Sequence, residues 1–171
     1  MLMARYPLHD MVFVREHRED KAGKAVTAAR RVVAEAEQNV QQKQQELEEY
    51  SRWRVAEEER LIMSIMRKPV KLGDITDMRL EISSMREREL ALTDQLRKAE
   101  GELDRAREEL EAARLAHKKA TQDLEKLTQH REVWRQEQNL EAERLADLEL
   151  EDFSGPRNHD LHPEDASYEL N

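Results

Sequence analysis

Several residue types are scarce in this sequence, and their scarcity excludes whole classes of protein. There is no cysteine, which excludes disulfides, thiolate metal sites and thiol catalysis. Four glycines, four prolines, two tryptophans, three tyrosines and two phenylalanines are too few for the turns and bulky core of a compact globular or β-sheet domain. No window approaches about 18 uncharged apolar residues, so we expect no segment to span a membrane.

The chain is instead rich in charge and in helix-forming residues. Ala, Glu, Lys, Leu and Arg make up more than half of it, a composition typical of long helices and coiled coils. The net charge of −9 argues against general nucleic-acid binding, which needs an excess of Lys and Arg. Residues 1–31 carry seven basic and four acidic groups, whereas residues 151–171 carry one basic and six acidic groups. The two regions are therefore expected to attract different partners.

Turn-forming residues divide the chain into two long segments. Pro7 is well tolerated in a first helical turn. Pro69 and Gly73 interrupt the middle, where Gly73 permits a left-handed cap and Asp74 can cap a new helix. After Gly155-Pro156 the sequence becomes polar and aperiodic. We therefore predict one hairpin domain over residues 1–152, with helices at about 7–67 and 75–152, a tip loop at 68–74, and a disordered acidic tail at 153–171.

The second predicted helix carries a heptad repeat of apolar residues. Stepping alternately three and four residues from Ile75 meets only two residues that are not apolar, Glu89 and His117. A strict heptad repeat implies left-handed supercoiling against a partner helix. The positions of this seam are Ile75, Met78, Ile82, Met85, Glu89, Leu92, Leu96, Ala99, Leu103, Ala106, Leu110, Ala113, His117, Ala120, Leu124 and Leu127. The first helix has a matching seam at Ala22, Val26, Ala29, Val33, Ala36, Val40, Lys43, Leu47 and Tyr50.

Small and large residues alternate along both seams, and this alternation predicts how they pair. In an antiparallel hairpin the numbers of facing residues have a constant sum. A sum of 142 pairs small residues with small ones, as in Ala36 with Ala106. A sum of 143 belongs to the same register and pairs the charged seam residues Arg54 and Glu89. A facing opposite charge offsets the cost of burying each one. The midpoint of this register falls in the predicted tip loop, so we predict an all-α fold: a long antiparallel two-helix coiled-coil hairpin.

Nothing in the sequence points to catalysis, a metal or a cofactor. His117 lies on the seam, where an interior imidazole is expected rather than a ligand. His159 and His162 are three residues apart, but Pro163 denies them a helix that would hold a metal. A two-helix rod offers no pocket that would shift the pKa of a carboxylate, and no phosphate-binding or nucleophile motif is present. We therefore expect a protein that is not an enzyme and that acts by binding partners.

Two regions carry more apolar or basic surface than the seam can use. One surrounds the tip, where the apolar residues either form a docking site or simply close the hairpin: Leu61, Ile62, Met63, Ile65, Met66, Val70 and Leu72. The other lies at the open end, where local packing explains part of the set: Arg5, Tyr6, Leu8, Met11, Val12, Phe13 and Val14, facing Arg131, Val133, Trp134 and Arg135.

Three aromatic landmarks indicate a family. They are the near-terminal Arg5-Tyr6-Pro7-Leu8, the segment Tyr50-Ser51-Arg52-Trp53-Arg54, and the segment Arg131–Glu137 around Trp134, which Glu141-Ala142-Glu143 follows. With two long helices and a central turn, the sequence resembles the YscO-like stalk proteins of bacterial type III secretion, relatives of the flagellar export protein FliJ, over about residues 4–152. It differs from them in having fewer consecutive glutamates after Trp134 and an added polar tail.

The resemblance implies a monomeric, non-enzymatic central stalk in the bacterial cytoplasm, peripherally associated with the secretion apparatus at the inner membrane. The end with both termini would enter the pore of a hexameric export ATPase, and the tip would reach the export gate. Contacts with secretion chaperones are also implied. Carried over to this chain, the ATPase contacts would be Arg5, Tyr6, Leu8, Arg15, Arg18, Arg131, Trp134 and Arg135. The gate contacts would be Met66, Val70, Leu72 and Ile75.

Two other functions remain open from the residues alone. A holdase chaperone would grip clients between helical arms, and a generic structural coiled coil would form part of a longer assembly. Both predict oligomers, whereas the stalk is a monomeric rod, so light scattering distinguishes them. The closely matched Ala, Val and Leu layers argue against open chaperone arms.

Overall fold

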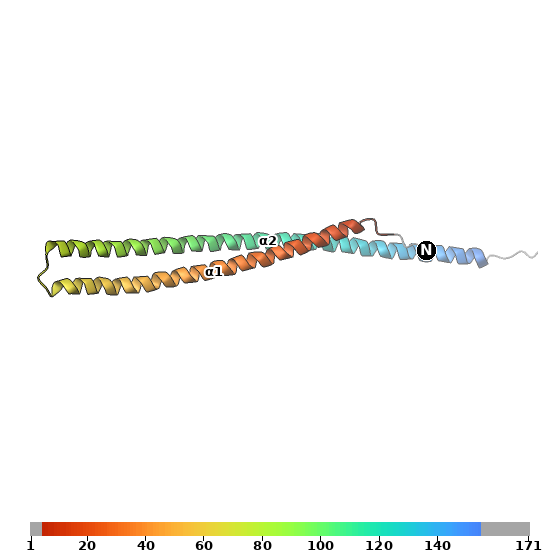
Figure 1. Cartoon of the computed structure of the whole chain (residues 1–171). Helices are drawn as coiled ribbons and strands as arrows, with labels where there is room; N and C mark the ends of the chain where they lie inside the picture. Colours follow the sequence, from red (N-terminus) through yellow and green to blue (C-terminus); the bar gives the residue numbers. More distant parts are fainter. Residues whose placement is uncertain (1–4, 155–171) are drawn as a thin grey trace, which may run out of the picture.

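The fold is all-α and consists of two long helices. The computed structural model describes residues 5–154, with α1 at His9–Met66 and α2 at Leu72–Ser154. Figure 1 shows the helices running side by side from a short loop at one end of the rod. The predicted antiparallel hairpin is therefore confirmed. Of the predicted tail, Phe153 and Ser154 are the last residues of α2, and the rest lies outside the described residues.

The first helix begins at His9 rather than near residue 7, because Pro7 lies in a turn in front of it. The His9 amide donates to the carbonyl oxygen of Tyr6 at 3.1 Å, which closes a turn with Pro7 in its second position. The Val12 amide then donates to the carbonyl oxygen of Leu8 at 3.1 Å, and regular helical hydrogen bonding follows. This turn brings Tyr6 back over the helix pair.

The second helix begins at Leu72 rather than near residue 75, and Gly73 and Asp74 play other roles than predicted. The Lys71 amide donates to Asp74 Oδ2 at 3.0 Å, and the Asp74 amide donates to the Lys71 carbonyl oxygen at 3.1 Å. Asp74 therefore lies inside the first turn and reaches back, as the acidic residue of a capping box does. Gly73 is helical, and no residue from 5 to 154 has a positive φ, so Gly73 forms no left-handed cap.

The core is a single seam between the two helices. Every seam position predicted from the sequence is buried or half-buried. Ala99 and Ala106 are only 3% and 5% exposed, and such small side chains let the two backbones approach closely. Between and beyond them, Leu103 and Leu110 are each 8% exposed. The alternation of small and large layers read from the sequence is therefore the packing pattern of the core.

The two helices differ in length, so pairing stops before α2 ends. The first has 58 residues and the second has 83. Trp134 is half-buried, and every residue from 135 to 154 is exposed. We call residues 135–154 the α2 extension. It is about 30 Å long at 1.5 Å per residue, and Figure 1 shows it projecting beyond the start of α1. Within the described part of the chain, neither helix has a stretch long and apolar enough to cross a membrane.

Candidate functional site

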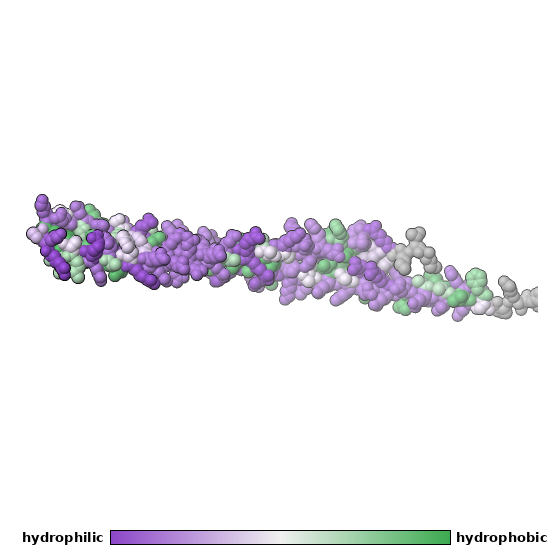
Figure 2. Space-filling model, turned by 60° about the horizontal axis from the view of Figure 1, so that its bottom comes forward, coloured by the Kyte–Doolittle hydropathy of each residue, from purple (hydrophilic) through white to green (hydrophobic). Residues whose placement is uncertain are grey.

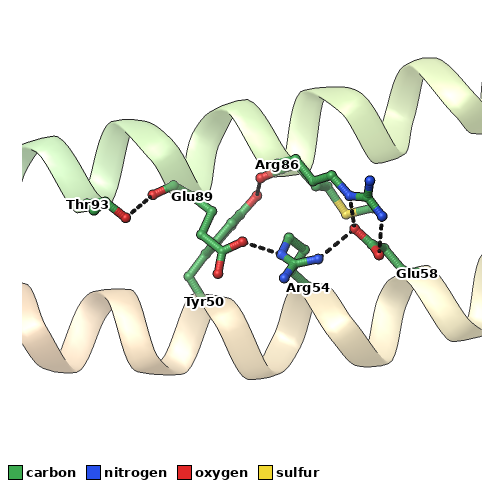
Figure 3. Close-up of polar contacts among 7 residues, drawn as sticks. Tyr50, Arg54, Glu58, Arg86, Glu89 and Thr93 are labelled. Atoms are coloured by element: carbon green, nitrogen blue, oxygen red, sulfur yellow. Dashed lines mark hydrogen bonds and ion pairs between the residues drawn. The ribbon is translucent and has the colours of Figure 1, made fainter.

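A charged layer interrupts the apolar seam about a fifth of the way along α1 from the tip. Arg54 Nε lies 2.5 Å from Glu89 Oε2, which confirms the facing pair predicted from the register. Arg54 Nη1 also donates to Glu58 Oε1 at 2.7 Å, and Arg86 donates to both oxygens of Glu58 at 3.0 and 3.2 Å (Figure 3). The side chains of Arg54, Glu58 and Glu89 are 17%, 14% and 23% exposed. Their mutual pairing compensates their burial, so this layer stabilises one register of the helices.

The charged layer predicts a pH dependence of stability. Hydrogen bonds from Arg86 and then from Arg54 hold the pKa of Glu58 below its ordinary value of 4.5. A carboxyl whose pKa is lower in the folded than in the unfolded state stabilises the fold above its unfolded pKa, and this stabilisation is lost as the pH falls through the folded pKa. We therefore expect Glu58→Gln to lower the melting temperature at pH 7 and to have a progressively smaller effect as the pH falls below 4.5, as measured by circular dichroism.

Glu59→Gln is the matched control for this experiment. Glu59 is exposed, and no ion pair in the described part of the chain includes it. Its substitution is expected to change the melting temperature little at either pH. Equal losses for the two variants at pH 7 would contradict a stabilising role for the charged layer.

At the open end, Tyr6 joins the start of the chain to α2. The Tyr6 hydroxyl lies 2.7 Å from His130 Nδ1, and its ring meets the Trp134 ring edge-on at a centroid distance of 5.4 Å. Tyr6 is 6% exposed and Val12, one turn into α1, is 3% exposed. These contacts fix where α1 starts against α2, and they place Tyr6 and Trp134 in a packed cluster rather than on an open surface.

Two polar pairs cross the seam between this cluster and the apolar core. Arg15 Nη1 donates to Asp123 Oδ2 at 2.8 Å, and both side chains are about 30% exposed. His117 Nε2 lies 2.8 Å from Glu19 Oε1. His117 is thus on the seam as predicted, and its polar partner is Glu19 of α1. Arg15 is engaged within the hairpin.

The residues predicted to contact an ATPase therefore fall into two groups. Four of them contribute to the packed or half-buried surface between the helices: Tyr6, Leu8, Arg131 and Trp134. Arg15 joins them through its pair with Asp123. Three arginines are exposed: Arg5, Arg18 and Arg135. Arg5 is paired with Asp10 at 3.0 Å on the surface. The exposed arginines are the members of the set that a partner can reach without opening the hairpin.

The α2 extension is a feature of this end that the sequence analysis missed. It carries seven acidic and two basic residues. Its large apolar side chains are all substantially exposed, from 46% at Leu145 to 91% at Phe153. The register itself predicts this extension, because residue numbers that sum to 142 place residue 7 opposite residue 135. A chain that starts pairing near residue 7 must therefore leave the rest of α2 unpaired.

At the tip, some apolar residues close the hairpin and others face outward. Leu61, Ile65 and the predicted gate contact Ile75 are half-buried. The other three predicted gate contacts are exposed: Met66 is 77%, Val70 38% and Leu72 81% exposed. Some of the predicted tip residues therefore close the hairpin, whereas others are exposed at its end. Figure 2 shows these hydrophobic groups gathered among hydrophilic ones at the end of the rod that bears the loop.

No arrangement for chemical catalysis was found in the described part of the chain. Residues 5–154 contain no group of three His, Cys, Asp or Glu side chains that could hold a metal ion. A shallow hollow between the helices is lined from both of them and includes Arg54, Arg86 and Glu89 of the charged layer.

Comparison with known proteins identifies the family. A family model described as type III secretion protein YscO matches residues 8–156. The chain belongs to the YscO family. The solved structure of type III secretion protein YscO from Vibrio parahaemolyticus is 27% identical, with a TM-score of 0.79 over 85% of this chain and 92% of that one. A putative YscO homologue from Chlamydia trachomatis is 22% identical, with a TM-score of 0.74 over 89% of this chain and 93% of that one, and shares the fold. No curated protein matches the chain.

The resemblance read from the sequence is thereby confirmed, and the structure gives its aromatic landmarks a physical role. In this YscO-family chain Tyr6 packs on Trp134 at the open end. Tyr50 donates its hydroxyl hydrogen to the Met85 carbonyl oxygen at 3.2 Å, and its ring lies 5.3 Å from that of Trp53. Tyr6 and Tyr50 each link the two helices. The landmarks are therefore positions where the YscO hairpin is held together.

Proposed function

We propose that this YscO-family protein is the central stalk of a type III secretion apparatus, coupling a hexameric export ATPase to the export gate. The end with the α2 extension and the exposed arginines enters the ATPase, and the tip contacts the gate. The protein acts as a monomer in the bacterial cytoplasm, next to the inner membrane, and has no catalytic activity of its own. Contact with secretion chaperones along the shaft belongs to the same proposal.

The observation that carries this proposal is a single rod whose two ends differ in chemistry. The shaft is a closed pair of helices for most of its length, and every predicted seam position is buried or half-buried between them. One end narrows to an acidic helix beside Arg18 and Arg135, and the other presents Met66 and Leu72. A protein that links two machines needs two distinct binding ends and a stiff connection between them.

The closed seam also argues against a holdase chaperone. Chaperone arms would have to expose the Ala, Val and Leu layers that here are buried between α1 and α2. Light scattering provides the direct comparison, because the stalk is expected to be a monomer. A stable oligomer would favour a generic structural coiled coil instead.

Reversing the charge of the exposed arginines is expected to weaken ATPase binding. In the double variant Arg18→Glu and Arg135→Glu, we expect the dissociation constant for the purified export ATPase hexamer to rise about tenfold or more, measured by biolayer interferometry. Arg15 is left intact because its pair with Asp123 lies within the hairpin, so its reversal would also destabilise the fold.

The matched control reverses two exposed shaft arginines, Arg97→Glu and Arg105→Glu. It makes the same change in net charge away from the open end. Circular dichroism should show equal helicity for both double variants. Unchanged ATPase binding by the Arg18 and Arg135 variant, with intact helicity, would refute this placement of the ATPase contacts.

A further inference from the structure

The tip of the rod combines exposed apolar side chains with a local excess of positive charge. No acidic residue occurs between Glu59 and Asp74, whereas the chain as a whole has a net charge of −9. Arg67, Lys68 and Lys71 are all exposed, and no ion pair in the described part of the chain includes them. The loop therefore differs sharply in charge from the acidic protein to which it belongs.

The apolar groups are interleaved with these cations. Met66 and Leu72 flank the loop and are 77% and 81% exposed, and Val70 between them is 38% exposed. Among the large hydrophobic residues of the described chain, only Phe153 is more exposed than these two flanking residues. In Figure 2 the tip shows hydrophobic and hydrophilic surface side by side at the extreme end of the rod.

We infer that this tip binds the surface of an anionic lipid bilayer. Lipid headgroups supply the phosphate charges that Arg67, Lys68 and Lys71 match, and the interfacial region accepts the side chains of Met66 and Leu72. The tip is a small convex surface, and a fluid bilayer needs no complementary shape to receive it. The contact is interfacial, since no helix of the described chain is suited to span a membrane.

The acidic shaft does not cancel this attraction when the rod stands on its tip. Glu59 lies seven residues before Met66, about 10 Å along the helix axis. That distance exceeds the Debye length of about 8 Å at physiological ionic strength, so Glu59 and the charges of α1 before it are largely screened from the surface. On α2 the nearest opposing charges are Asp74, one of whose carboxylate oxygens already accepts the Lys71 amide, and Asp77. These two carboxylates are outnumbered by Arg67, Lys68 and Lys71. The local balance at the loop remains positive.

This inference does not depend on the proposed function, because it uses only the chemistry of the tip. It is compatible with a gate contact at the same end, since lipids would surround any gate that lies in a membrane. The two are separated experimentally by leaving all secretion proteins out of the assay.

The test is sedimentation of the full-length protein with vesicles of phosphatidylethanolamine and phosphatidylglycerol, compared with vesicles of phosphatidylcholine alone. Binding is expected only to the anionic vesicles and should be lost at high salt. Each basic residue near an anionic surface strengthens binding about fivefold, so the triple variant Arg67→Gln, Lys68→Gln and Lys71→Gln should bind about 100-fold more weakly. The uncharged double variant Met66→Gln and Leu72→Gln should also bind more weakly, by the loss of apolar insertion.

The control is a variant in which one arginine and two lysines of the shaft, instead of the tip, are replaced by glutamine. Arg97, Lys118 and Lys119 are exposed residues of α2 far from the tip. Their replacement by glutamine should leave vesicle binding within about twofold of the original, because they lie beyond the screening length. Equal loss in the tip and shaft triple variants, equal binding to neutral vesicles, or no binding at all would overturn the inference. So would a tip triple variant that loses binding to a purified gate protein but retains vesicle binding.

Discussion

Replacing Leu110 with alanine is expected to lower the free energy of unfolding by about 2–4 kcal/mol, the usual cost of truncating a buried leucine. Leu110 is 8% exposed and forms one of the large layers of the seam, next to the small layer at Ala106. A two-helix rod has no second core that could compensate for the loss. Urea unfolding followed by circular dichroism measures the change.

Leu115→Ala is the control for this prediction, because Leu115 lies on the same helix and is 60% exposed. Its truncation should change the free energy of unfolding by about 0.5 kcal/mol or less. Similar losses at Leu110 and Leu115 would mean that the seam between α1 and α2 is not the core of the molecule in solution.

Tyr6→Ala is expected to cost about 3 kcal/mol, in the range seen when a buried aromatic side chain is removed. Tyr6 is the residue that attaches the start of α1 to α2, through the Trp134 ring and through His130. Its loss should therefore release the first turns of α1 before the rest of the rod unfolds. Hydrogen exchange should show lost protection near residues 9–22 and unchanged protection near the tip.

Two further variants separate the parts of this contact. Tyr6→Phe removes only the hydrogen bond to His130 and should cost about 1 kcal/mol. Phe13→Ala removes an aromatic ring of similar size that is 70% exposed, and should have little effect. If Phe13→Ala were as damaging as Tyr6→Ala, the aromatic cluster at the open end would not be the attachment point described here.

The sequence predicted the hairpin and its seam because both follow from periodicity. Each seam position is defined by a step of three or four residues, and a constant sum then relates the two helices. Arg54 and Glu89 are the clearest case: the register placed these two opposite charges across from each other, and they form an ion pair in the structure. Backbone register is a property of the whole repeat, so no single side chain had to be placed correctly.

The features that the sequence analysis missed depend on how individual side chains and caps are arranged. Long side chains reach diagonally across the seam, so His117 contacts Glu19 and Arg15 contacts Asp123 rather than residues directly opposite. Asp74 was predicted to cap α2 from outside, but its carboxylate accepts an amide from the residue three positions earlier. The open-end residue Tyr6 was predicted as a binding residue and proves to be nine-tenths buried, because the Pro7 turn folds it back.

Because α1 is shorter than α2, the diameter of the rod changes abruptly where the helix pair gives way to a single helix. A lone helix with its side chains is about 10–12 Å across, and a packed pair is nearly twice as wide. A pore wide enough for only one helix therefore admits the α2 extension, residues 135–154. It excludes the helix pair, which begins where Tyr6 packs on Trp134. The depth of insertion is then determined by the molecule's own step in diameter.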